Sequence, residues 1–95
     1  VRVPFNCTIK DVYGVISSKS SGTASVTGII EHGTNATGSL TQSVASTAYS
    51  STTTGDIGSV TDGNLDTGDF LRFRSTATTG TDVIFSITIR YYKDL

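Results

Sequence analysis

The chain has 95 residues, a formal net charge of −1 and 36% hydrophobic residues, which suits a single domain with a modest core. The low charge, without a cluster of Lys and Arg, excludes the nucleic-acid-binding classes, and no apolar run is long enough for membrane insertion. The single cysteine excludes an internal disulfide framework and a cysteine-based zinc site.

Ser and Thr make up roughly a third of the chain, far above ordinary usage. Because Thr favours strands and Ser favours turns, this bias predicts an all-β domain. No window shows helical periodicity, whereas apolar and polar residues alternate in several short runs. We therefore expect one β-domain over residues 1–95.

The first half of the chain reads as a series of short strands. In order, they are expected at residues 1–9, 12–16, 23–30, 40–44 and 47–54. The alternation slips near Lys10 and Asp11, which predicts a β-bulge or bend there. Cys7 follows the apolar phase and is expected to be buried as a small apolar residue. Residues 31–39 and 55–69 are expected to form loops.

The last third of the chain carries the clearest pattern, two alternating runs separated by a polar turn at residues 75–82. Leu71 and Phe73 share one face of the first run. The apolar face of the second run is formed by Val83, Phe85, Ile87, Ile89 and Tyr91. The pattern predicts an antiparallel hairpin with one apolar face, which the rest of the chain must cover. Short strands at this spacing predict an antiparallel, jelly-roll-like β-sandwich of about eight strands.

Two stretches, VPFNCTI near the start and GDFLRF near the end, resemble the start and end of a recurring module of phage tail fibres and receptor-binding proteins. The matching residues are Val3, Pro4, Phe5, Cys7, Thr8, Ile9, Gly68, Asp69, Leu71, Arg72 and Phe73. Their order and positions extend the resemblance over essentially the whole chain. Residues 31–39 depart from it, because many relatives carry an aromatic, Pro-containing segment there. The resemblance implies a β-sandwich at the C-terminal end of a longer virion fibre protein.

The resemblance implies a non-enzymatic virion module, on a tail fibre or on the capsid surface, that is commonly a homotrimer. The leading hypothesis is a receptor-binding tip, whose partners are host cell-surface polysaccharide or protein and other virion proteins. The alternatives are a capsid decoration or head-fibre domain and a carbohydrate-binding module. A nearly neutral surface rich in Ser, Thr and Gly suits glycan recognition through hydroxyl hydrogen bonds and aromatic platforms.

Three residues are candidate ligand contacts. Tyr49 lies in the polar middle of the chain and is predicted to be a sugar-stacking platform. His32 and Asn35 lie in the expected loop at residues 31–39, and exposed loops carry binding more often than strands do. Tyr91 follows the apolar phase of its run, so we expect it in the core.

Three arginines, Arg72, Arg74 and Arg90, fall opposite the apolar faces of the last two runs. They suit either an anionic glycan or ion pairs at a subunit interface. Because Phe70 and Ile84 share those faces, the sequence favours an oligomer interface.

The remaining polar motifs favour neither a metal nor catalysis. Several acidic and amide side chains crowd the region before the last two runs: Asp56, Asp62, Asn64, Asp66 and Asp69. A calcium loop that begins at Asp62 would place Thr67 where Gly is required and Phe73 where Glu is required, so we expect a solvated turn and no metal or cofactor. A Ser-His-Asp site through His32 stays open by residue inventory, but no nucleophile motif accompanies it, and we expect no enzyme.

Overall fold

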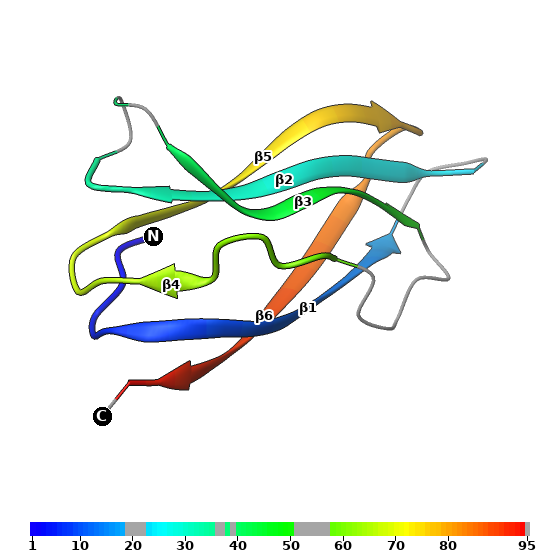
Figure 1. The fold of residues 1–95 in the computed structure, drawn as a ribbon. Helices are drawn as coiled ribbons and strands as arrows, with labels where there is room; N and C mark the ends of the chain where they lie inside the picture. Colours follow the sequence, from blue (N-terminus) through cyan, green and yellow to red (C-terminus); the bar gives the residue numbers. More distant parts are fainter. Residues whose placement is uncertain (19–22, 36–37, 39, 51–57, 95) are drawn as a thin grey trace.

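The computed structural model describes residues 1–18, 23–35, 38, 40–50 and 58–94. Six strands lie in these residues: β1 (Cys7–Ser18), β2 (Ser25–Gly33), β3 (Thr41–Ser50), β4 (Asn64–Leu65), β5 (Phe70–Thr79) and β6 (Ile84–Lys93). They form two antiparallel sheets of three strands, sheet A with the order β3-β2-β5 and sheet B with the order β4-β1-β6 (Figure 1). No helix of the described residues is long and apolar enough to cross a membrane.

The all-β prediction is confirmed, but the predicted number of about eight strands is wrong for the described residues. The runs at residues 1–9 and 12–16 both enter the long strand β1. Those at 40–44 and 47–54 likewise share the single strand β3 over its described length. One side of each strand faces solvent and tolerates polar residues, so a polar stretch between two apolar runs does not by itself end a strand.

The apolar faces of the two sheets pack against each other and form the core. The larger buried cluster contains Val3, Cys7, Ile9, Val12, Ile30, Val44 and Leu65, and a smaller one contains Ile16, Ala24 and Val26. Each fully buried aliphatic side chain of this kind stabilises the fold by about 1.5–3 kcal/mol. The predicted burial of Cys7 is confirmed, since the residue is 4% exposed. Two sheets that meet in this way are compatible with a β-sandwich.

The predicted bulge near Lys10 and Asp11 is confirmed. Ile9 is opposite Tyr91 and Asp11 is opposite Arg90, so Lys10 is an extra residue on β1. The bulge changes the phase of the alternation, which lets both Ile9 and Val12 face the core.

The predicted terminal hairpin is wrong. β5 pairs with β2 in sheet A, whereas β6 pairs with β1 in sheet B. The turn between them therefore carries the chain from one layer to the other. Phe73 and Phe85 face each other across the layers with ring centroids 5.2 Å apart. Alternation identifies the apolar face of each strand but not the strand to which it is hydrogen-bonded. The apolar faces of β5 and β6 are covered when the two strands lie in different sheets and these faces pack against each other.

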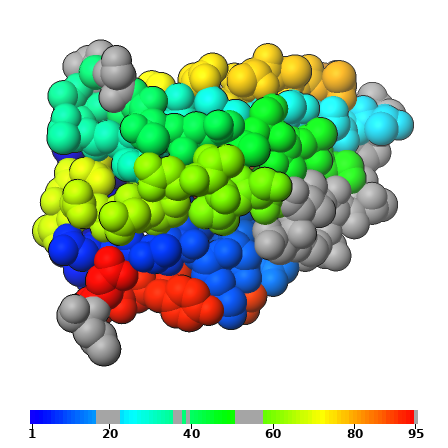
Figure 2. Space-filling view, viewed as in Figure 1, coloured from blue at the N-terminus to red at the C-terminus, as the bar shows by residue number. Residues whose placement is uncertain are grey.

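One side of the molecule is closed by residues 58–65, which connect the two sheets. The Ala45 amide of β3 donates to the Ser59 carbonyl at 2.9 Å, and the Ile9 amide of β1 donates to the Gly63 carbonyl at 2.8 Å. Figure 2 shows this segment, in light green, filling the space between β3 and β1. The opposite edges of the two sheets are β5 and β6.

The N-terminal segment, residues 1–3, pairs with the start of β5. The Val3 amide donates to the Asp69 carbonyl at 2.9 Å, and the Leu71 amide donates to the Val1 carbonyl at 2.8 Å. Gly68, in the turn before β5, has a φ of 87°, a conformation that glycine adopts without strain. The beginning of the chain and the start of β5 are therefore side by side.

Candidate functional site

Arg72 and Arg74 share one carboxylate on the outer face of sheet A. Arg72 Nη2 donates to Glu31 Oε1 at 3.0 Å, and Arg74 Nε donates to the same oxygen at 2.9 Å. The Glu31 side chain is 11% exposed. The predicted loop at residues 31–39 begins later than expected, because β2 continues to Gly33 and places Glu31 opposite Arg72.

Arg90 forms a separate ion pair on the outer face of sheet B. Its Nε donates to Asp11 Oδ1 at 2.6 Å, its Nη2 donates to Asp11 Oδ2, and its guanidinium carbon lies 5.2 Å from the centroid of the Tyr13 ring. The predicted interface residues are therefore divided between two sheets. Ile84 is 59% exposed on β6, and Phe70 on β5 packs under the Arg2 guanidinium, 5.5 Å from its ring centroid.

These ion pairs change the titration of their carboxyl groups. Hydrogen bonding to Arg90 holds the pKa of Asp11 below its ordinary value, against the opposing effect of burial. The pKa of Glu31 is lowered chiefly by its hydrogen bond to Arg74, with a further contribution from Arg72. Because the unfolded chain binds these protons more tightly, the stabilisation is complete above the unfolded-state pKa values, about 4, and is lost as the pH falls through the lowered folded-state values.

We expect Asp11→Asn and Glu31→Gln to flatten the acid limb of the stability curve. Each variant lacks one carboxyl group whose pKa folding lowers, so its free energy of unfolding should fall less steeply than that of the parent below about pH 4. Urea unfolding at a series of pH values measures this slope. Asp62→Asn is the control, and a parent-like slope in both test variants would show that the two ion pairs are absent in solution.

His32 lies in β2, next to the loop where it was predicted, and its Nδ1 forms a short hydrogen bond with Ser43 Oγ. Ser43 is 0% exposed, so its hydroxyl is not open to a substrate. This pair links β2 to β3 within sheet A. Nothing in its geometry indicates a nucleophile.

Tyr49 is not a surface platform, and its prediction as a sugar-stacking residue is wrong. The residue is 1% exposed, and its ring lies 5.3 Å from that of Phe85 on the opposite sheet. A ring buried on both faces has no surface to offer to a sugar. The residues around Tyr49 are polar, so the local composition does not reveal that position 49 faces the core. Tyr91, predicted in the core, is 52% exposed because it lies near the end of β6.

Asn35 lies in an exposed turn at one end of the molecule. Its Oδ1 accepts a hydrogen bond from the Gly38 amide at 2.7 Å. Arg2 Nη1 ties this turn to the turn before β5, since it donates to the Thr34 carbonyl and to the Gly68 carbonyl, at 3.0 Å each. The N-terminal segment and both turns therefore meet at one end, on the left of Figure 1.

An apolar pocket of about 210 Å³ opens at the same end. Its lining comes from residues 1–5 and from four strands: Val1, Arg2, Val3, Pro4, Phe5, Cys7, Ile9, Leu65, Leu71, Ile89 and Tyr91. The Tyr91 ring lies 5.6 Å from that of Phe5. Burial raises the pKa of the Cys7 thiol, so this group stays protonated and uncharged near neutral pH. The pocket suits an apolar group rather than an ion.

Sequence reasoning missed this pocket, because five segments that are distant in the chain form it together. Its strand residues Cys7, Leu71 and Ile89 follow the alternation expected of core positions, so the pattern does not distinguish a pocket from a closed core. An aromatic residue near the chain end, Tyr91, is the one local sign of a binding surface. Its position in the alternation predicts a core residue instead.

The acidic turn before β5 uses its carboxylates locally. Asp69 Oδ2 accepts from the Asp66 amide at 2.9 Å, and Asp62 Oδ1 accepts from the Asn64 amide at 3.3 Å. No group of three or more candidate metal ligands occurs among the residues that the structure describes, and Asp56 lies outside them. Nearby, Asn6 Oδ1 accepts from the Thr67 amide at 2.7 Å, which fixes this turn against the start of β1.

Comparison with family models, with curated proteins and with solved structures gives no match for this chain.

Proposed function

We propose that the chain is a non-enzymatic module of a phage virion, the receptor-binding tip of a tail fibre that engages a host cell-surface glycan or protein. One observation supports this most directly. The two stretches that carry the resemblance are paired through Val3 and Asp69, so they form one structural unit rather than two unrelated strands. Two antiparallel sheets that pack face to face are also compatible with a β-sandwich module of this kind.

The proposed receptor-binding surface is the end that carries the pocket and the turn at Asn35. It combines an apolar hollow with exposed hydroxyl, amide and aromatic groups, the mixture that glycan and protein recognition uses. Tyr91 is the more exposed of its two aromatic lining residues, at 52%, and it packs against the other, Phe5. The subunit number is a separate question, because Arg72, Arg74 and Arg90 each form an ion pair within the chain.

Binding of the fluorescently labelled domain to host cells tests the proposal. We expect saturable binding that unlabelled domain displaces. Tyr91→Ala should weaken it by about tenfold, since an aromatic residue at the centre of a binding surface carries much of the binding energy. Tyr92→Ala is the matched control, because Tyr92 is the next residue and is similarly exposed, at 57%, but does not line the pocket.

Two other results would point to other functions. Association with capsids but not with cells would favour a capsid decoration or head-fibre domain. Binding to a soluble polysaccharide without binding to cells or capsids would favour a carbohydrate-binding module. Equal losses of cell binding in Tyr91→Ala and Tyr92→Ala would show that the pocket is not part of the receptor-binding surface.

A further inference from the structure

β6 has β1 as a hydrogen-bonded neighbour on one side, and no strand of the described residues pairs with its other edge. The direction of its backbone groups follows from the pairing. The Asp94 amide, just after β6, donates to the Asn6 carbonyl just before β1, at 2.9 Å. Successive residues of a strand direct their backbone groups to opposite sides. The extra residues in this pairing lie on β1, so β6 keeps a regular alternation.

The even-numbered residues of β6 therefore direct their backbone groups to β1, and the odd-numbered ones direct theirs to the open edge. The edge carries the amide and carbonyl groups of Phe85, Ile87, Ile89, Tyr91 and Lys93. β6 contains no Pro or Gly, and no bulge interrupts this edge. Pro, bulges and charged side chains are the usual means of blocking an edge strand. β6 carries charges only at Arg90 and Lys93, towards its C-terminal end, so its central part is available to another strand.

We propose that this edge binds a second copy of the chain, through antiparallel pairing of β6 with β6 about a two-fold axis at Thr88. Ile87 of one copy then lies opposite Ile89 of the other, and Phe85 lies opposite Tyr91. These residues direct their backbone groups to the edge, so each of these pairs exchanges two hydrogen bonds. Sheet B becomes a continuous sheet of six strands across the two copies.

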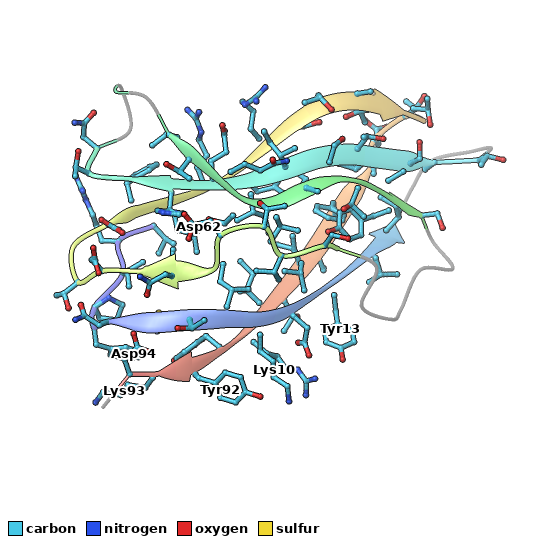
Figure 3. All side chains as sticks on the ribbon, viewed as in Figure 1. Lys10, Tyr13, Asp62, Tyr92, Lys93 and Asp94 are labelled. Carbon is cyan, nitrogen blue, oxygen red and sulfur yellow. The ribbon has the colours of Figure 1, made fainter. Side chains whose placement is uncertain are left out.

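The side chains on the outer face of β6 complement one another in this register. Ile84 of each copy lies opposite Tyr92 of the other, and these residues are 59% and 57% exposed in the single chain. Figure 3 shows Tyr92 beside Lys10 and pointing away from the opposite sheet. Arg90 lies opposite Ser86, so the pairing brings no like charges together. Aromatic and β-branched residues directly opposite each other stabilise antiparallel pairs.

Neighbouring registers lose this complementarity. An axis at Arg90 places the two arginines opposite each other, and like charges in that position destabilise a strand pair. An axis at Ile89 places Ile84 opposite Asp94, and an axis at Ile87 places Ile84 opposite Arg90. In both registers this exposed apolar side chain faces a charged residue. Only the axis at Thr88 covers both exposed apolar residues of the outer face. The fit of β6 to itself is the reason to identify the occupant as a second copy rather than an unrelated strand.

The inner face of β6 is consistent with this pairing. Phe85, Ile87 and Ile89 face the space between the sheets but remain only partly buried. A further strand beside β6 would cover them from the open side. A contact of this kind is smaller than a standard stable interface of about 1,600 Å², so we expect a weak dimer that dissociates on dilution.

Charged substitutions of Thr88, the residue on the proposed two-fold axis, test the proposal. We expect the parent chain to increase from one to two chain masses over a concentration series in light scattering. Thr88→Lys and Thr88→Glu should each raise the dissociation constant by about tenfold, because the two-fold axis places like charges opposite each other. An equimolar mixture of the two variants should restore the dimer. Ser46→Lys, on an exposed position of β3, is the control for added charge.

Amide hydrogen exchange provides a second readout on the parent chain. The Ile87, Ile89 and Tyr91 amides should exchange more slowly as the concentration rises, whereas the Thr88 and Arg90 amides, already bonded to β1, should not change. A single-chain mass at every concentration would overturn the proposal, as would a stable trimer or a mixture of charge variants that fails to pair. Self-association is measured without a receptor, so its failure is distinguishable from failure of the proposed function.

Discussion

Replacing Tyr49 with Ala should lower the free energy of unfolding by about 3–5 kcal/mol, the range for removing a large buried aromatic side chain. Tyr49 extends from β3 in sheet A, and its ring packs on Gly14 of β1 and on Phe85 of β6 in sheet B. The side chain is 1% exposed. Its removal would leave a cavity between the sheets that the surrounding strands cannot close. Chemical denaturation with a shared m-value measures the loss.

Two control variants separate this packing effect from a general sensitivity to substitution. Tyr49→Phe keeps the ring and should cost much less than Tyr49→Ala. Tyr92→Ala removes an aromatic ring of the outer face and should change the stability of the single chain by no more than about 0.5 kcal/mol. Similar losses for Tyr49→Ala and Tyr92→Ala would contradict the position of Tyr49 between the sheets.

Gly14→Ala should lower the free energy of unfolding by about 1–3 kcal/mol, the usual range for overpacking. A Cβ at position 14 would lie 2.5 Å from Tyr49 Cδ1 and 2.8 Å from Tyr49 Cε1. Neither side can move easily, because Gly14 is paired with Ile87 within sheet B and the ring is enclosed. The gain from a less flexible unfolded chain, about 0.4–1 kcal/mol, offsets only part of the loss.

A double-mutant cycle tests the cause of this loss. In a Tyr49→Ala background the added methyl group has space, so Gly14→Ala should there be neutral or stabilising. The coupling between the two positions should therefore reach 1 kcal/mol or more, as expected for residues in direct contact, where about 0.5–3 kcal/mol is usual. Additive effects would mean that residue 14 and Tyr49 do not touch.

The sequence predicted the faces of the strands well and the pairing of the strands poorly. The bulge at Lys10 and the buried side of Cys7 both followed from local alternation. Whether β5 joins β6 or β2 depends on which apolar faces meet in space, and period-two alternation carries no information about that. The hairpin prediction was wrong because a turn rich in Thr and Gly suits a link between layers as well as a link within one sheet.

The candidate site was predicted less well than the fold. Asn35 was correctly placed in an exposed turn, but Tyr49 was assigned to the surface because its neighbours are polar. The partners of the arginines were also missed. Glu31 is 41 residues from Arg72, and Asp11 is 79 residues from Arg90. No local pattern links residues so far apart, and only the pairing of the strands identifies their partners.

The last two strands, β5 and β6, belong to different sheets, and the core, the pocket and the open edge of β6 all depend on this arrangement. Interstrand nuclear Overhauser effects between backbone protons test it directly. The structure predicts contacts of Ile30 with Phe73 and of Val12 with Ile89, and none between the backbones of β5 and β6. A regular ladder of backbone contacts between β5 and β6 would show a terminal hairpin and rule out two separate sheets.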